Sequence, residues 1–148
     1  MAEKPEKHEA NVLGKLQLLL VTYEKKVLEV ECDEVTLPGK KGYFGVLPGH
    51  VALIASLKVG ELMYRQGKVE HYLALSGGFC EVVDDVVTVM AEFAQLPSEI
   101  DVAAAHREQA EAEAVLGSVS DEALAQALAK LETAVTRIQV VLVAFLTS

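Results

Sequence analysis

The hydrophobic pattern of this chain changes abruptly at Pro97. From Lys15 to about Phe93, short apolar runs and period-two alternation are separated by turn residues, which is typical of β-strands. Residues 98–148 are rich in Ala and Glu, with one glycine, Gly117, and no proline, which favours helices. The chain is therefore expected to fold as a strand-built part followed by a helical part.

The strand region contains many short segments joined by tight turns. A first largely apolar run spans residues 16–21, and residues 28–33 then alternate between apolar and acidic side chains. Two later hairpins turn at Gln66-Gly67 and at Asp84-Asp85. Many short strands with no helical pattern between them predict an antiparallel β-sandwich or flattened barrel.

Residues 42–50 interrupt this pattern with three glycines, one proline and two aromatic residues. Glycine and proline at this density require sharp turns, while Phe44, Val46 and Leu47 still need apolar contacts. We therefore expect a shaped loop that is fixed to the core and presented to a partner.

Two helices are predicted after Pro97. Ser98 with Asp101 resembles a capping box at the start of the first helix, which runs to Leu116, and Ser118 with Asp121 repeats that signal for the second. The first helix presents small side chains, including Ala103, Ala110 and Ala114. An antiparallel two-helix hairpin is the expected arrangement.

The second helix carries large apolar residues at heptad spacing, here called the seam. Such a stripe most often packs inside its own chain. Its length, and the small side chains of the first helix, favour the alternative that it faces a partner. The seam consists of Leu124, Leu128, Leu131, Val135, Ile138, Leu142 and Phe145.

Charge and composition exclude several classes of protein. The formal net charge of −9 argues against nucleic acid as a partner, because phosphate binding needs a concentrated basic surface. The longest apolar runs fall far short of the roughly 20 residues that a membrane span needs. Residues 1–14 carry no signal or transit pattern and are expected to form a flexible tail.

No catalytic or metal-binding constellation is recognisable. The chain's histidines are His8, His50, His71 and His106, and no two stand at the spacing of metal ligands. No Ser or Cys stands in a nucleophile motif, so the chain is not expected to be an enzyme. One alternative remains, a free-standing small-molecule-binding β-module of cupin-like type, which would require clustered His and Glu.

Several segments together resemble the epsilon subunit of bacterial F-type ATP synthase. They are Gly45-Val46-Leu47-Pro48-Gly49-His50, Leu57-Lys58-Val59-Gly60-Glu61-Leu62, Leu75-Ser76-Gly77-Gly78-Phe79-Cys80-Glu81-Val82, Val87-Thr88-Val89 and Ile100-Asp101. The resemblance implies an α+β, mainly β fold, with a ten-stranded antiparallel sandwich over residues 15–97 and a two-helix hairpin over residues 98–148.

The resemblance also implies a function. Such a chain is a non-catalytic subunit of the central stalk, or rotor, that couples c-ring rotation to ATP synthesis. Its sandwich contacts the gamma subunit and the c-ring. Its helical hairpin inhibits ATP hydrolysis when it extends into the alpha/beta catalytic head. The protein would lie on the cytoplasmic face of the bacterial cell membrane, attached only through the complex.

Site residues carried over by this resemblance fall into three groups. The seam is the regulatory surface, and Asp101 and Arg137 are the candidates for a weak ATP contact. Ala104 stands where ATP-binding members carry an arginine, so ATP is not expected to bind and no cofactor is expected. The residues implied in binding gamma and the c-ring are Lys40, Lys41, Gly42, Tyr43, Phe44, His50 and Ser76; many members carry an acid at the position of Tyr43.

Overall fold

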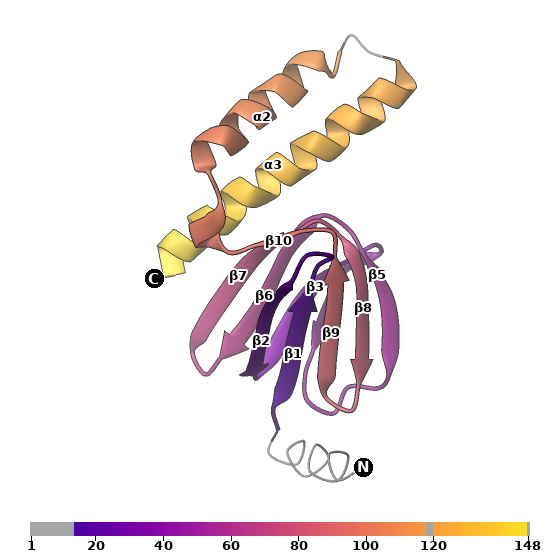
Figure 1. The fold of residues 1–148 in the computed structure, drawn as a ribbon, viewed down its shortest axis with the longest axis vertical. Coiled ribbons are helices and arrows are strands. Elements are labelled where there is room, and N and C mark those ends of the chain that lie inside the picture. Colours follow the sequence, from indigo (N-terminus) through magenta and orange to yellow (C-terminus); the bar gives the residue numbers. More distant parts are fainter. Residues whose placement is uncertain (1–13, 118–119, 148) are drawn as a thin grey trace.

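The computed structural model describes residues 14–117 and 120–147. In this part of the chain, ten strands are followed by a helical hairpin (Figure 1). The expected tail, except Gly14, lies outside the described residues. The strands are β1 (Leu16–Val21), β2 (Lys26–Cys32), β3 (Glu34–Gly39), β4 (Gly42–Val46), β5 (Leu53–Leu57), β6 (Gly60–Gln66), β7 (Val69–Leu75), β8 (Gly78–Val83), β9 (Val86–Ala91) and β10 (Ala94–Gln95). The helices are the 3-10 turn η1 (Pro97–Glu99), α2 (Val102–Val115) and α3 (Asp121–Thr147).

The ten strands form one sheet that curls into a nearly closed sandwich, so the predicted mainly β fold is confirmed. Strand order is β10-β7-β6-β3-β5-β8-β9-β1-β2, with β4 beside β3. The backbone N–H of Asp33, just after β2, donates to the carbonyl oxygen of Arg65 in β6 at 2.7 Å. This bond extends the β3–β6 ladder by one residue, and β2, one end of the strand order, also contacts β6.

One strand pair differs from the antiparallel arrangement predicted from the sequence. β1 runs parallel to β9, with Gln17 opposite Val86 and Val21 opposite Met90. The other pairs in the sheet are antiparallel. A hydrophobic alternation specifies which face of a strand is buried, but it carries no information on the direction of a distant neighbour.

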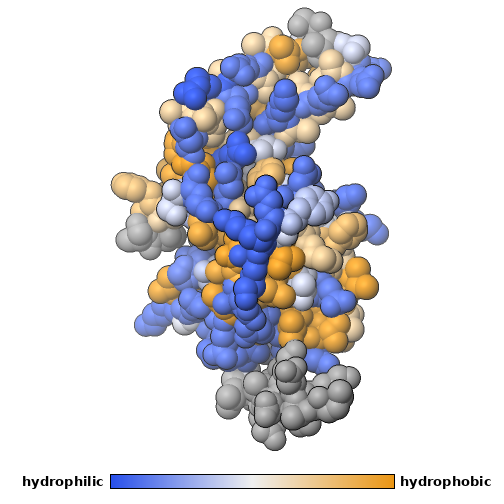
Figure 2. All heavy atoms as spheres, in the orientation of Figure 1, coloured by the Kyte–Doolittle hydropathy of each residue, from blue (hydrophilic) through white to orange (hydrophobic). Residues whose placement is uncertain are grey.

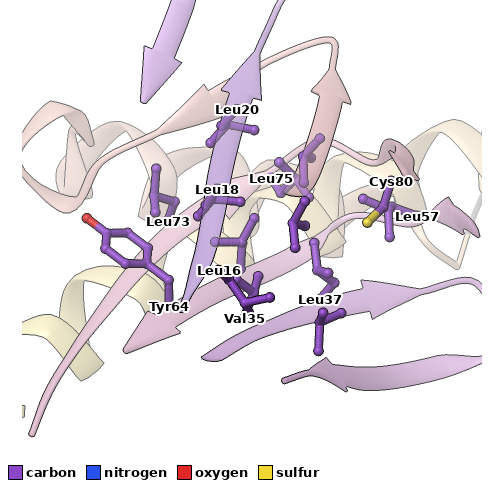
Figure 3. Packing of buried hydrophobic residues seen from close by; sticks show 14 of the residues in the cluster. Leu16, Leu18, Leu20, Val35, Leu37, Leu57, Tyr64, Leu73, Leu75 and Cys80 are labelled. Carbon is purple, nitrogen blue, oxygen red and sulfur yellow. The ribbon is translucent and has the colours of Figure 1, made fainter. Parts of the chain in front are cut away.

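The core of the sandwich consists of large aliphatic side chains that point inward from nearly every strand (Figure 3). Leu18 and Leu20 of β1, Leu62 of β6 and Leu73 of β7 are fully buried. The predicted apolar face of β2 is confirmed, since Cys32 is buried and Leu28 and Val30 pack against the core.

The segment 42–50, expected to be one shaped loop, is half strand. Gly42–Val46 forms β4 and pairs with β3, with Pro38 opposite Tyr43 and Val35 opposite Val46. The tight turn is restricted to residues 47–50, where the His50 N–H donates to the Leu47 carbonyl oxygen at 3.1 Å. Glycines concealed the strand in the sequence, because they break the alternation on which strand prediction rests.

The two helices begin at caps other than the serines predicted from the sequence. Ser98 lies in η1, and the cap of α2 is Asp101, whose carboxylate accepts the Ala104 N–H at 3.0 Å. Ser118, predicted to cap the second helix, lies outside the described residues. The Ser120 hydroxyl oxygen accepts the Ala123 N–H at 3.4 Å, so this serine caps α3.

Alanine side chains form the contact between the two helices of the hairpin. The fully buried residues between α2 and α3 include Ala105 and Ala112 on α2, and Ala127 and Ala134 on α3. Each pair is seven residues apart, so small side chains form a heptad stripe that lets the helices approach closely. Ala103, Ala110 and Ala114, expected to serve this purpose, are not buried.

The hairpin contacts the sandwich through the second half of α3 (Figure 1). Val140 of α3 packs with Ala74 of β7 and with Ile100, while Tyr72 and Val141 flank them. The C-terminal end of α2 and the N-terminal end of α3 lie far from the sandwich. The hairpin is therefore attached at one end, and this attachment is made by few side chains.

Candidate functional site

The β3–β4 turn forms an exposed, basic tip. Lys40 and Lys41 join the paired residues Gly39 and Gly42, and all but Gly39 are exposed. Phe44 points the other way and packs against the sandwich core. Of the residues expected to bind the c-ring, Phe44 therefore stabilises the tip, whereas the two lysines are available to a partner.

Tyr43 connects this tip to the start of β6. Its hydroxyl oxygen accepts the backbone N–H of Glu61 at 3.1 Å. A Cβ added at the neighbouring Gly60 would lie 2.6 Å from the Pro38 Cβ and 2.7 Å from the Tyr43 oxygen, so only glycine fits there. The Tyr43 ring remains largely exposed and can contact a partner while its hydroxyl is fixed.

The turn that contains His50 is anchored to a different hairpin. The Gly49 N–H donates to the Asp85 carboxylate at 2.7 Å, and the His50 Nδ1 lies 2.7 Å from the Val51 carbonyl oxygen. Asp85 is buried and adopts a positive φ of 63° in the β8–β9 turn. His50 is thus half-buried. It does not belong to the β3–β4 tip, and the backbone beside it is held in place by the Gly49–Asp85 hydrogen bond.

Ser76 has a structural role in its turn. Its hydroxyl oxygen accepts the Phe93 N–H at 2.9 Å, and its own N–H donates to the Phe93 carbonyl oxygen at 3.1 Å. A Cβ at the nearby Gly78 would lie 2.0 Å from the Met90 carbonyl oxygen. The Ser-Gly-Gly sequence is therefore required for the close approach of this turn to β9, and Ser76 lines the pocket that results.

An exposed apolar face, which sequence reasoning did not identify, lies beside this pocket. Ile54 is 76% exposed, Phe79 55% and Met90 52%. Phe79 stands directly opposite Met90 in the β8–β9 pair, and both line a pocket of about 400 Å³ together with residues 21–23 and 76–78. The apolar face is defined here as Ile54, Phe79, Val83 and Met90. Figure 2 shows apolar residues among charged ones where β8 and β9 lie.

A sequence signal for this face does exist. Strands β8 and β9 carry apolar residues on both faces, in Phe79-Cys80-Glu81-Val82-Val83 and Val86-Val87-Thr88-Val89-Met90. The inward set, Cys80, Val82, Val87 and Val89, fills the core. On the outward face Phe79 stands opposite Met90, while the exposed Glu81 lies between Phe79 and Val83 and opposite Ile54. The exposed apolar residues therefore form a candidate interaction surface that contains one acid.

Arg137 connects α3 to two other segments. Its guanidinium donates to the Gln95 side-chain oxygen at 2.8 Å and to the Glu108 carboxylate at 3.0 Å, and it lies 5.4 Å from the centre of the Phe93 ring. These four residues are called the Arg137 cluster. Since Glu108 is on α2 and Gln95 in β10, one side chain joins both helices to the sandwich.

The two candidates for an ATP contact are each occupied within the chain. Asp101 caps α2, and Arg137 is bound in its cluster. Ala104 offers no charge where ATP-binding members of the family carry arginine. A triphosphate is bound through several charge-assisted hydrogen bonds, so the arrangement offers it few free donors.

None of the seven seam residues is fully buried. Leu128 and Leu142 are exposed and Phe145 is 78% exposed, while the others are half-buried. The buried residues of α3 are Ala127, Ala134, Thr136 and Val140. Four seam residues are therefore partly buried within this chain and three are exposed, and the large side chains lie beside the alanine stripe.

Both cysteines are unreactive in this fold. Cys32 and Cys80 are buried and unpaired, and burial raises the pKa of each thiol to about 11. Among the described residues, no group of three or more His, Cys, Asp or Glu side chains is arranged to hold a metal ion. Neither α2 nor α3, over the residues described, has the combined length and hydropathy of a membrane-spanning helix.

Comparisons with known proteins agree with the fold. The family model for the ATP synthase delta/epsilon chain β-sandwich domain matches residues 15–97. The ATP synthase epsilon chain of Geobacter sp. (strain M21) is 45% identical over 128 residues, covering 85% of this chain and 93% of the relative. That of Syntrophobacter fumaroxidans is 43% identical over 127 residues, covering 85% of this chain and 95% of the relative.

Solved structures give the same result. A chain in the Euglena gracilis mitochondrial ATP synthase, in a complex described as OSCP/F1/c-ring, aligns with a TM-score of 0.75 at 27% identity, covering 89% of this chain and 81% of that one. A chain from the central stalk and c-ring of the Tetrahymena thermophila enzyme aligns with a TM-score of 0.60 at 16% identity, covering 86% of this chain and 96% of that one. The second likeness supports the fold alone.

Proposed function

This chain belongs to the ATP synthase delta/epsilon family, and we propose that it couples rotation of the c-ring to ATP synthesis through contacts with the gamma subunit and the c-ring. It is a non-catalytic stalk subunit of the ATP synthase complex. The cupin-like alternative is not favoured by these relatives.

The observation that supports gamma as a partner is the apolar face. Ile54, Phe79, Val83 and Met90 are exposed on the outer surface of β5, β8 and β9, and the helical hairpin packs elsewhere, on β6 and β7. An exposed apolar surface with a pocket beside it suits a stable protein contact, in which the central apolar residues contribute most of the binding free energy.

The test is association with gamma. Phe79→Glu places a charge opposite Met90 on the apolar face, and we expect it to weaken the complex about thirtyfold or more, the loss typical of a large apolar residue that is buried in the contact. The matched control is Val69→Glu, which changes an equally exposed valine at the β6–β7 turn. Equal affinities of both variants, measured by calorimetry on folded protein, would exclude the apolar face as the gamma surface.

For the c-ring we propose the β3–β4 tip. The exposed Lys40 and Lys41 and the fixed ring of Tyr43 support it. The double substitution Lys40→Glu and Lys41→Glu reverses the charge of the tip, and we expect it to reduce association with the c-ring while the gamma complex stays intact. Loss of gamma binding in the same variant would show that the tip belongs to the gamma surface instead.

For the hairpin we propose inhibition of ATP hydrolysis by contacts of the seam with the alpha/beta head. The incomplete burial of the seam supports this role. A chain that ends after Pro97 should keep coupled synthesis and lose the inhibition of hydrolysis. If hydrolysis by the assembled enzyme is unchanged by the truncation, the hairpin is not an inhibitor.

Regulation is proposed to proceed without bound ATP or another cofactor, because Arg137 is already paired and Ala104 replaces the arginine. A ligand that binds only the folded state raises the melting temperature. We therefore expect no rise when ATP is titrated against the isolated chain, and a rise that saturates would contradict this.

We propose a peripheral position on the cytoplasmic face of the bacterial cell membrane, reached only through the complex. The bacterial relatives support this assignment. Purified chain should not sediment with lipid vesicles and should sediment with vesicles that contain the reconstituted complex; sedimentation with lipid alone would contradict it.

A further inference from the structure

Glu61 lies beneath the helical hairpin. It faces outward from β6 and pairs directly with Ala74 of β7. Directly opposed residues of an antiparallel pair point to the same face, and Ala74 packs with Val140 of α3 and with Ile100. The Glu61 side chain therefore shares the face that α3 covers, and α3 contacts both β6 and β7 there (Figure 1).

The carboxylate of Glu61 has a buried oxygen without a partner. Among the described residues, Oε2 of Glu61 is the buried side-chain polar atom that accepts no hydrogen bond. A carboxylate taken out of water without a hydrogen bond or a cation is costly, and the cost is removed when the group takes up a proton.

No cation in the described part of the chain contributes to the pKa of the Glu61 carboxyl, which is raised by burial. On β7, the Tyr72 hydroxyl donates to the Glu70 carboxylate at 3.0 Å. On β4, Tyr43 is engaged with the Glu61 backbone. The charged residues of β3, η1 and the distal part of β6 are engaged elsewhere: Glu34 with Arg65 at 3.3 Å, and Glu99 with the Leu96 N–H at 2.9 Å.

The part of α3 that covers this site is also uncharged. The last charged residue of the chain is Arg137, which is bound in its cluster, and residues 138–146 carry no titratable side chain. Burial raises the pKa of the Glu61 carboxyl above its ordinary value of 4.5. The docked hairpin thus favours the protonated form of this one residue.

We propose that Glu61 makes docking of the hairpin on the sandwich proton-dependent, with the protonated carboxyl favouring the docked hairpin and the carboxylate favouring its release. The docked state binds more protons than the released state, so docking weakens as the pH rises above 4.5 and levels off above the raised pKa. Each unit of elevation weakens docking about tenfold.

The effect of Glu61 on ATP hydrolysis in the assembled enzyme rests on the proposed function, in which the hairpin inhibits hydrolysis. If the hairpin inhibits hydrolysis after it leaves the sandwich, acidification on the side where this subunit lies would retain it in the docked, permissive position. The docking equilibrium itself is a property of the isolated full-length chain and can be measured without the complex.

The experiment measures hydrogen exchange of the α3 amides between Ile138 and Ala144 by nuclear magnetic resonance, corrected for the intrinsic pH dependence of exchange. A released helix frays, so these amides report opening. Glu61→Gln replaces the carboxylate with a neutral group of the same shape. We expect opening in the unsubstituted chain to increase with pH, and opening in Glu61→Gln to stay low and independent of pH.

Two further measurements keep the test decisive. Glu70→Gln removes an exposed carboxylate from the same face of β7, and we expect it to behave as the unsubstituted chain does. The Glu61 carboxyl carbon should titrate above 4.5. An identical pH profile in Glu61→Gln and the unsubstituted chain, or an ordinary midpoint for Glu61, would overturn the proposal. Neither outcome bears on gamma binding, which is tested separately.

Discussion

The sandwich and the hairpin bury different kinds of side chain. Leucines and valines fill the sandwich, and among them Leu18, Leu20, Leu62 and Leu73 are completely buried, each contributing about 1.5–3 kcal/mol. The hairpin is closed by alanines, whose methyl groups contribute about 0.8 kcal/mol each. The comparison teaches that the sandwich can remain folded while the hairpin changes position, because little of the total stability depends on helix contacts.

The largest expected effect is in the sandwich core. Leu73→Ala removes a fully buried side chain from β7 and should lower the free energy of unfolding by about 2–5 kcal/mol. Since β7 also supports α3, unfolding of the sandwich in urea should release α3 as well, although the hairpin can detach from a folded sandwich. A loss under about 1 kcal/mol would show that the core is looser than its burial indicates.

A smaller effect is expected where the helices meet. Ala134→Leu forces a large side chain into the alanine stripe and should destabilise the hairpin by about 1–3 kcal/mol. Hydrogen exchange should increase in α2 and α3 and stay unchanged in β1 and β9. The control is Ala129→Leu, at an exposed position of the same helix. Equal effects in strands and helices would show that the two parts are one cooperative unit.

Arg137→Ala should have a still smaller effect, which is confined to docking. It removes charge-assisted hydrogen bonds to Gln95 and Glu108 and should weaken attachment of the hairpin by about 1–2 kcal/mol, since the guanidinium is partly exposed. Lys130→Ala, on the exposed side of α3, is the control. Exchange of the α3 amides measures the difference, and identical behaviour of the two variants would exclude the cluster as an attachment point.

The smallest expected effect is the dependence of stability on pH, which has opposite signs in the sandwich and at the docked hairpin. The Lys15 ammonium, the Gly67 N–H and Arg65 hold the pKa of Asp33 below its ordinary value of 3.8. Asp33 therefore stabilises the sandwich above that pH, and the contribution is lost as the pH falls below it. Glu61 affects the hairpin in the other direction.

Melting temperatures between pH 2.5 and 7, roughly the range over which carboxylates titrate, test this expectation. Asp33→Asn should melt lower than the unsubstituted chain at neutral pH, and the difference should shrink in acid. A constant difference across the range would show that the carboxylate charge of Asp33 does not contribute.

Much of the fold was accessible from the sequence because burial and alternation coincide. Residues 28–32 alternate in sequence and in burial, and the Asp84-Asp85 turn lies where it was expected. β4 was missed because Gly42 and Gly45 remove the side chains that reveal alternation. The parallel pairing of β1 with β9 was missed because pairing across a long sequence separation is a tertiary property.

The functional surfaces were harder to predict from the sequence than the fold. Lys40, Lys41 and Tyr43 were expected to bind a partner and are exposed, but the spacing of residues in the sequence does not identify that partner. The apolar face was hidden because Phe79 and Met90 belong to runs whose alternate members, Cys80 and Val89, fill the core. The seam was identified from its large apolar side chains at heptad spacing. The residues that are buried where α2 and α3 meet are alanines instead, because only small side chains let two helices approach closely.

Pairing of β1 with β9 also determines when the sandwich can form. During synthesis Gln17 leaves the ribosome long before Val86, its neighbour in the finished sheet. Until β9 emerges, β1 can pair with β2, but its second edge stays unpaired. Contacts between residues distant in sequence form slowly, and an exposed strand edge promotes aggregation. The helices α2 and α3 follow β9 and β10 in the chain, so the sandwich can be complete before the whole hairpin has emerged.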